Sequence, residues 1–124
     1  MGSEMCIRDR YEAYGGLQND GIMLAVYYDV DAAKIIHQLD SWEKINDSPT
    51  ISSILKNVSS YFGLDFVIPE IASGNFFLYD NSQHKELRSE AEMNTLLLHS
   101  EDVNFSLVVW DDEKHTIYIV EYRI

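Results

Sequence analysis

The chain has 124 residues, a net charge of −12 and a hydrophobic content of 46%, the proportions of one acidic globular domain. This charge repels nucleic acid phosphates and anionic membrane surfaces, so it argues against both as partners and favours a basic protein partner. The longest apolar run, Ile22 to Tyr28, is much shorter than the ~20 residues of a membrane span, and the sequence shows no secretion signal, so we expect a cytoplasmic protein.

The first ten residues do not resemble native protein sequence. Met5 to Asp9 back-translates to a DNA segment that resembles the transposase end used in tagmentation libraries. We therefore expect residues 1–10 to be sequencing-adapter read-through, followed by a single acidic domain over residues 11–124 that is truncated at its N-terminus. The only cysteine, Cys6, lies in this opening segment, so the rest of the chain offers no thiol for a disulfide or a zinc site. The net charge remains −12 without the segment, because its basic and acidic residues balance.

The first elements expected along the chain are a loop, a strand and a helix. Tyr11 to Asp20 has no hydrophobic period and predicts a loop. Ile22 to Val30 is a nearly continuous apolar and aromatic run, which predicts a central strand covered on both faces. Asp31 can cap a following helix. The apolar face of that helix would consist of Ala32, Ile35, Ile36, Leu39 and Trp42.

The middle of the chain predicts a second helix and then two short strands. Ser48 is suited to the N-cap position and Pro49 to the first helical position, and Gly63 is placed to end the helix. Asp65 to Ile68 predicts a strand that a proline stops. A turn containing glycine then leads into Phe76 to Tyr79, so these two strands are expected to form a hairpin.

The last third predicts a polar loop, a short helix and a hairpin. The loop covers Asp80 to Arg88, and Ser89 with Glu92 forms a capping box for the helix that follows. Phe105 to Trp110 and Thr116 to Tyr122 are rich in residues that favour strands and flank a turn. The expected order is β-α-α-β-β-α-β-β. This order predicts the α+β class, a largely antiparallel sheet with about three helices packed on it.

One group of acidic residues suggests a metal site. Asp29 and Asp31 end a hydrophobic strand, where two carboxylates can hold Mg²⁺. A strand ending in Asp-x-Asp resembles the first motif of haloacid dehalogenase-type phosphatases, and Asp111-Asp112 resembles their late acidic motif. The resemblance implies a Mg²⁺-dependent phosphatase in which these carboxylates converge. However, Ala32-Ala33 follows Asp31 in place of glycine and threonine, and the late pair opens a hairpin turn. This reading is therefore kept as an alternative, and no metal or other cofactor is expected.

Other catalytic signatures are not found in the sequence. The four histidines are too scattered for a ligand pair at helical spacing, and none of the serines lies in a nucleophile elbow. No phosphate-binding glycine motif occurs, and the lysines and arginines do not cluster. We therefore expect no catalytic residues and favour a protein that is not an enzyme.

A second group of acidic residues suggests an interface. Carboxylates beside an exposed aromatic side chain are typical of binding surfaces for Arg- and Lys-rich partners. The candidate interface residues are Glu101, Asp102, Trp110, Asp111, Asp112 and Glu113. The alternative for this group is a solvated hairpin tip with the tryptophan packed into the core.

Size and charge lead to a functional expectation. Small acidic α+β proteins resemble, in general character, bacterial immunity proteins and phage-encoded inhibitors that occupy a basic site. We therefore expect a non-enzymatic acidic binding protein that neutralises a basic protein partner. The alternative is an accessory or C-terminal domain of a larger protein whose active part lay upstream of Tyr11. The sequence does not indicate an oligomeric state.

Overall fold

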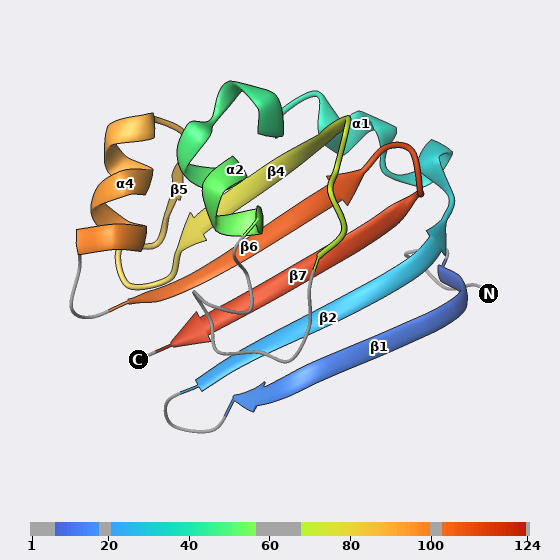
Figure 1. Cartoon of the computed structure of the whole chain (residues 1–124), viewed down its shortest axis with the longest axis horizontal. Helices are drawn as coiled ribbons and strands as arrows, with labels where there is room; N and C mark the ends of the chain where they lie inside the picture. The colour runs from blue at the N-terminus through green and yellow to red at the C-terminus, as the bar shows by residue number, and fades with distance from the viewer. Residues whose placement is uncertain (1–6, 18–20, 57–67, 100–102, 124) are drawn as a thin grey trace.

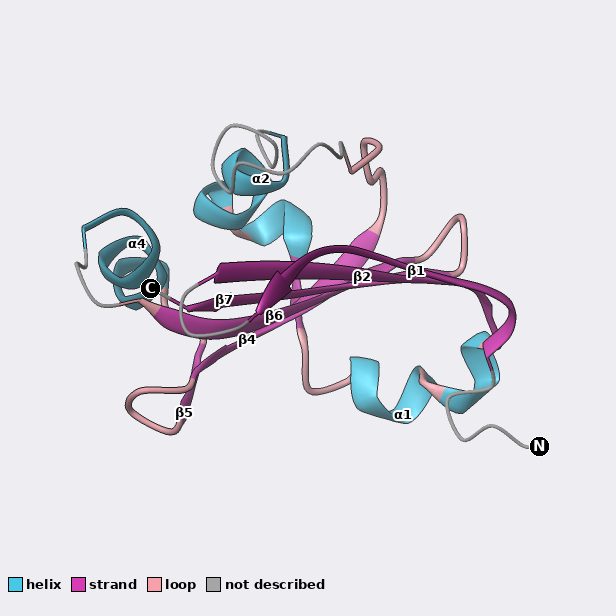
Figure 2. Cartoon of the chain, turned by 90° about the horizontal axis from the view of Figure 1, so that it is seen from below, coloured by secondary structure: helices cyan, strands magenta, loops and turns pink. Residues whose placement is uncertain are grey.

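The computed structural model describes residues 7–17, 21–56, 68–99 and 103–123, which form an antiparallel sheet with helices on both faces (Figures 1 and 2). The α+β class and the antiparallel sheet expected from the sequence are therefore confirmed. Within these residues, no helix is long and apolar enough to cross a membrane. The elements are β1 (Ile7–Leu17), β2 (Gly21–Val30), α1 (Ile36–Leu39), β3 (Glu43–Lys44), α2 (Pro49–Lys56), β4 (Gly74–Asp80), β5 (Lys85–Leu87), α4 (Glu90–His99), β6 (Asn104–Asp111) and β7 (Thr116–Arg123).

The strand order places the C-terminal hairpin in the middle of the sheet. Neighbouring strands follow the order β1-β2-β7-β6-β4-β3, and β5 pairs with β4 outside this path. Strands β6 and β7 form the expected terminal hairpin, with Asn104 opposite Arg123 and Asp111 opposite Thr116. Because β7 then pairs with β2 along most of its length, the last strand of the chain joins the N-terminal hairpin to the rest of the sheet (Figure 1).

The first strand corrects the prediction of a loop. Tyr11 to Leu17, expected to be irregular, continues from Ile7 as strand β1 and pairs with β2. Ladder hydrogen bonds to a strongly strand-forming neighbour outweigh the weak local pattern of β1, which contains two adjacent glycines. The backbone of residues 7–10 belongs to this strand. The assignment of residues 1–10 to an adapter sequence stays a prediction.

Two helices and one face of the sheet enclose the main core. Figure 2 shows α2 and α4 on the same side of the sheet. Alternate side chains of β2, β4, β6 and β7 point to that side, because successive residues of a strand face opposite ways. The strand residues of this core include Leu24, Val26, Phe76, Leu78, Phe105, Leu107, Val109, Tyr118 and Val120, and the helices contribute Ile51, Ile54, Leu55, Met93, Leu96 and Leu97.

A smaller core lies on the opposite face of the sheet, under α1 (Figure 2). Val30, Ile35, Trp110 and Ile117 are its buried members. The partly buried side chains packed against them are Tyr27, Ala32, Leu39, Trp42, Val108 and Ile119. The sheet is therefore covered on both faces only where this second core lies.

The helix expected after Asp31 is shorter and less regular than predicted. A 3₁₀ turn covers Ala32–Lys34, and α1 extends only over Ile36–Leu39. Ile35 between them has φ −114°, far from the value of about −60° in a regular helix, so the two turns do not form one regular helix. Most of the predicted apolar face still packs on the sheet, but the side chain of Ile36 is 54% exposed.

Several other predictions are confirmed, but the hairpin expected before Phe76 to Tyr79 is corrected, because β4 already begins at Gly74 and pairs in the described chain with β3, β5 and β6. Helix α2 begins at Pro49 and α4 follows Ser89, whose hydroxyl accepts a hydrogen bond from the Glu92 amide at 3.0 Å. The loop predicted over Asp80 to Arg88 is corrected, because β5 lies within it and pairs with β4. The predicted helix end at Gly63 and most of the predicted strand Asp65 to Ile68 lie outside the described residues.

Glu90 links the two helices of the main core. Its carboxylate accepts hydrogen bonds from the Ser48 hydroxyl at 2.6 Å and from the Thr50 amide at 2.8 Å. It therefore caps the N-terminus of α2 from the first residue of α4, where a negative charge is favoured. Partial burial acts to raise the pKa of Glu90, but the hydrogen bonds from Ser48 and Thr50 outweigh it and hold the pKa below its ordinary value.

We expect Glu90→Gln to lower the free energy of unfolding by about 1–2 kcal/mol at neutral pH, because it removes a charged acceptor from the helix end. The folded-state pKa lies below the unfolded value, so this stabilisation is complete above pH ~4.5 and is lost as the pH falls through the lower folded-state pKa. Urea denaturation of both chains across acidic pH measures the difference. A difference that persists unchanged at the lowest pH would contradict the assignment.

Candidate functional site

The β6–β7 turn is shaped by a buried aspartate. The Asp111 side chain is 1% exposed, and its Oδ1 accepts hydrogen bonds from the amides of Glu113 at 3.0 Å and Lys114 at 3.1 Å. The turn closes at His115, whose φ of 51° is left-handed. These bonds hold the exposed Glu113 and Lys114 outward from the end of the sheet.

The same construction recurs in the β4–β5 turn. Asp80 is also buried, and its Oδ1 accepts from the amides of Ser82 at 2.9 Å and Gln83 at 3.3 Å. His84, in the position corresponding to the last residue of the β6–β7 turn, has φ 56°. Both turns therefore share one local structure, in which an aspartate is followed by a polar residue at the third position and a histidine at the fourth. The remaining residues of the two turns differ in charge.

A second acidic segment lies beside the β6–β7 turn. Asp29 is left-handed with φ 55°, and this residue interrupts the strand alternation, so Val30 packs under α1 rather than in the main core. The Val30 amide donates a hydrogen bond to the His115 carbonyl at 2.9 Å. Asp31 then accepts from the Ala33 amide at 3.0 Å, the predicted cap, although it caps the 3₁₀ turn and not a long helix.

These contacts bring together two groups that the sequence analysis treated separately. An open hollow of about 460 Å³ is lined by residues 29–32 and 113–115. We use the name acidic end for Asp29, Asp31, Asp112 and Glu113, which surround or adjoin this hollow. Asp29, Asp112 and Glu113 are exposed, and Asp31 is half-buried. The acidic end also carries Lys114 and His115, so it is mixed in charge but predominantly negative.

Two of the predicted interface residues do not present their side chains to solvent. Trp110 is 0% exposed and belongs to the smaller core, where its ring stacks on His115 with centroids 5.7 Å apart. Its Nε1 donates to Asp112 Oδ1 at 3.2 Å. Asp111 is buried as described above. The expectation of an exposed aromatic anchor at this turn is therefore corrected, because both faces of the sheet are covered at Trp110. Glu101 and Asp102 lie outside the described residues.

One oxygen of the buried aspartate has no hydrogen-bond partner. Asp111 Oδ2 is fully enclosed and unpaired, in contrast to Oδ1. Burial raises the pKa of Tyr118 to about 12, with the Asp111 carboxylate and Tyr28 adding to the shift. The Tyr118 hydroxyl therefore stays protonated at neutral pH.

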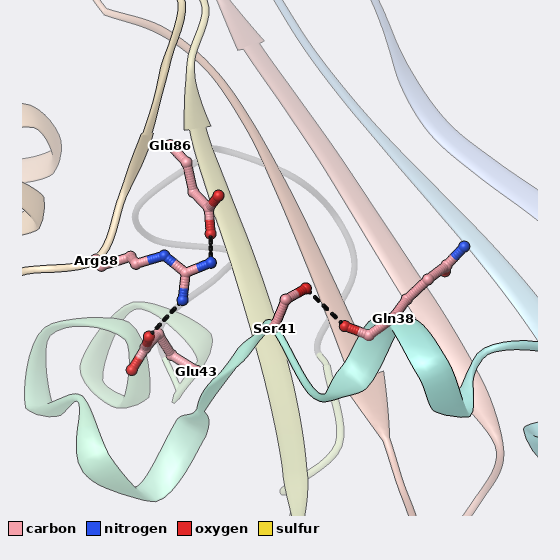
Figure 3. A network of polar contacts seen from close by, with 5 residues as sticks. All are labelled: Gln38, Ser41, Glu43, Glu86 and Arg88. Atoms are coloured by element: carbon pink, nitrogen blue, oxygen red, sulfur yellow. Dashed lines mark hydrogen bonds and ion pairs between the residues drawn. The ribbon is translucent and has the colours of Figure 1, made fainter.

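The carboxylates of the acidic end are not neutralised by ion pairs within the described part of the chain. The ion pairs there all lie around β5, where Lys85 pairs with Glu92 at 2.7 Å and Arg88 contacts both Glu43 and Glu86 (Figure 3). The Arg88 guanidinium thus compensates two carboxylates at once. Carboxylates around β5 are therefore paired, whereas those of the acidic end, like several others of the described residues, are not.

The arrangement does not form a metal centre among the described residues. There, no three His, Cys, Asp or Glu side chains are close enough together to hold a metal ion. Asp31 Oδ1 already accepts the hydrogen bond that caps the 3₁₀ turn, and Asp111 Oδ1 already accepts hydrogen bonds from the β6–β7 turn. The geometry of Asp29, Asp31, Asp111 and Asp112 therefore gives no support to the Mg²⁺-dependent alternative.

Fold and surface together define an α+β structure with an open acidic end and, among its described residues, no group of side chains that could hold a metal ion. No family model, no curated protein and no solved structure matches the chain.

Proposed function

We propose that the chain is a cytoplasmic, non-enzymatic binding protein that neutralises a basic protein partner, in the manner of an immunity protein or inhibitor. The observation that carries the proposal is the unpaired acidic end. Asp29 and Asp31 come from one strand end and Glu113 comes from a turn far away in sequence, yet all three line one hollow, and Asp112 precedes Glu113 in the same turn.

The local backbone supports recognition at this end. Asp29 and His115 both hold left-handed conformations, which are uncommon for residues other than glycine and cost free energy. Hydrogen bonds hold the backbone of both segments, so the positions from which the carboxylates extend are set before a partner arrives. A preorganised negative surface speeds encounter with a basic protein and loses less entropy on binding.

The test compares two triple variants with the same change in charge. Asp29→Asn/Asp112→Asn/Glu113→Gln alters the acidic end, and Asp40→Asn/Asp47→Asn/Glu70→Gln alters exposed carboxylates elsewhere. Each changes the net charge from −12 to −9. Asparagine tolerates the left-handed region and can still accept the Trp110 hydrogen bond, so we expect both variants to fold.

The probe is a short, capped peptide of alternating arginine and leucine, measured by isothermal titration at low ionic strength. We expect the acidic-end variant to lose about tenfold in affinity, since each exposed charge pair contributes up to ~1 kcal/mol, and the control variant to lose much less. Equal losses in the two variants would show that only the net charge matters and would overturn the proposal of a specific acidic end.

A further inference from the structure

Part of the sheet face under which α1 lies carries no helix of the described residues. In Figure 2, α1 lies under one part of the sheet, and no other α-helix among the residues that the structure describes lies on that side. Phe77, Val108 and Ile119 lie side by side on β4, β6 and β7, in the middle of the sheet, with Phe77 opposite Val108 and Val108 opposite Ile119. Val108 and Ile119 pack against the edge of the smaller core, and the Phe77 ring lies 6.1 Å from the Trp42 ring, yet all three side chains are only half-buried. They form a partly exposed apolar strip beside the part of the face that α1 covers.

A polar row lies next to this strip. Tyr79 on β4 is opposite Ser106 on β6, which in turn is opposite Glu121 on β7. Each residue of this row lies two positions along its strand from a residue of the apolar strip, so the row and the strip face the same side of the sheet. The row therefore offers an aromatic ring and a carboxylate on either side of a serine.

The Glu121 carboxylate is held in place but not neutralised. The Ser106 hydroxyl donates to Glu121 Oε1 at 2.8 Å, and Asn81 Nδ2 donates to Ser106 Oγ at 3.1 Å. Among the described residues Glu121 makes no ion pair. Glu86, opposite Tyr79 on the other side, differs because Arg88 pairs with it and with Glu43 (Figure 3). Glu121 is thus an oriented carboxylate with no ion pair among the described residues, and Arg123 lies two positions further along β7 on the same face.

We propose that this surface receives an arginine side chain of the basic partner, an inference that rests on the proposed function. The arginine stem would lie on the apolar strip, as long basic side chains commonly do, while the guanidinium pairs with Glu121 and lies against the Tyr79 ring. The net charge of −12 favours a basic side chain as the group that binds here. A second copy of the chain would bring the same charge and be repelled.

The test is a titration of the ¹⁵N-labelled chain with the same arginine–leucine peptide, followed by nuclear magnetic resonance at low ionic strength. We expect the amides of Tyr79, Ser106 and Glu121 to shift with the bound fraction. Glu121→Gln should weaken binding about fivefold, and Glu70→Gln, an equal change of charge at an exposed site, should leave the affinity unchanged. A peptide with citrulline in place of arginine should produce no shifts at these residues.

The possible outcomes separate this inference from the proposed function. Shifts confined to the acidic end, with Glu121→Gln binding as tightly as the native chain, would overturn the arginine site and leave the proposed function standing. Failure of the native chain to bind the peptide at all would overturn both. If Glu121→Gln self-associates with no loss of affinity, the carboxylate serves to prevent sheet stacking, and the inference is wrong.

Discussion

Replacing Gly74 with alanine is expected to lower the free energy of unfolding by about 3 kcal/mol, because the strand start has no room for a side chain. A Cβ at this position would lie 2.1 Å from the Trp110 carbonyl oxygen, 3.0 Å from Ile71 Cγ2 and 3.1 Å from Ile45 Cδ1. The oxygen belongs to the backbone of β6, so it can move only if the β4–β6 pairing moves with it. Gly74 begins that ladder, opposite Asp111.

The neighbouring residue supplies the control for Gly74. Ser73 is exposed, and its carbonyl, which accepts a hydrogen bond from the Asp112 amide at 2.9 Å, is unaffected by a change of side chain. Ser73→Ala should therefore change stability by less than ~0.5 kcal/mol. Urea denaturation followed by far-UV circular dichroism measures both variants. If Gly74→Ala is as stable as Ser73→Ala, then β4 and β6 are not packed as described.

Truncating Trp110 is expected to have a similar or larger effect, about 3–5 kcal/mol for Trp110→Ala. Its ring is fully enclosed between the sheet and α1, stacks on His115 and donates to Asp112. Removing it would leave a cavity in the smaller core, which has few other buried residues to close the gap. The free energy of unfolding of this variant is measured by chemical denaturation.

A conservative change separates the structural role of Trp110 from the role in binding that the sequence suggested. Trp110→Phe keeps most of the buried ring but loses the hydrogen bond to Asp112, so a cost of about 1–2 kcal/mol is expected. Its affinity for the arginine–leucine peptide should equal that of the native chain. A clear loss of affinity in a variant that remains folded would restore Trp110 as a contact residue.

The sequence predicted the fold best where period and turn chemistry agreed. The β6–β7 hairpin, β2 and the start of α2 at Pro49 all combine a clear hydrophobic pattern with an identifiable boundary residue. Strand β1 has no such pattern, since its pairing with β2 depends on a partner that local sequence does not show. The three residues of β5 are too few to express a period inside a polar segment.

The site was harder to predict because it depends on contacts between distant segments. Asp29 and Glu113 were each noticed as acidic, but their proximity follows from the hydrogen bond between Val30 and His115 and from the central place of β7. The burial of Trp110 required knowing that α1 covers that part of the sheet. Glu121 and Tyr79 were not singled out, although the alternation of residues along β7 places Glu121 on the face opposite Val120.

The most direct test of the account is the dependence of peptide affinity on salt concentration for the native chain and the two triple variants. If the acidic end is the recognised surface, log Kd should rise steeply with log salt for the native chain and for the Asp40/Asp47/Glu70 variant. The slope should be much smaller for the Asp29/Asp112/Glu113 variant. Three parallel lines would contradict the account, because they would mean that the charge acts as a diffuse field and no particular patch is recognised.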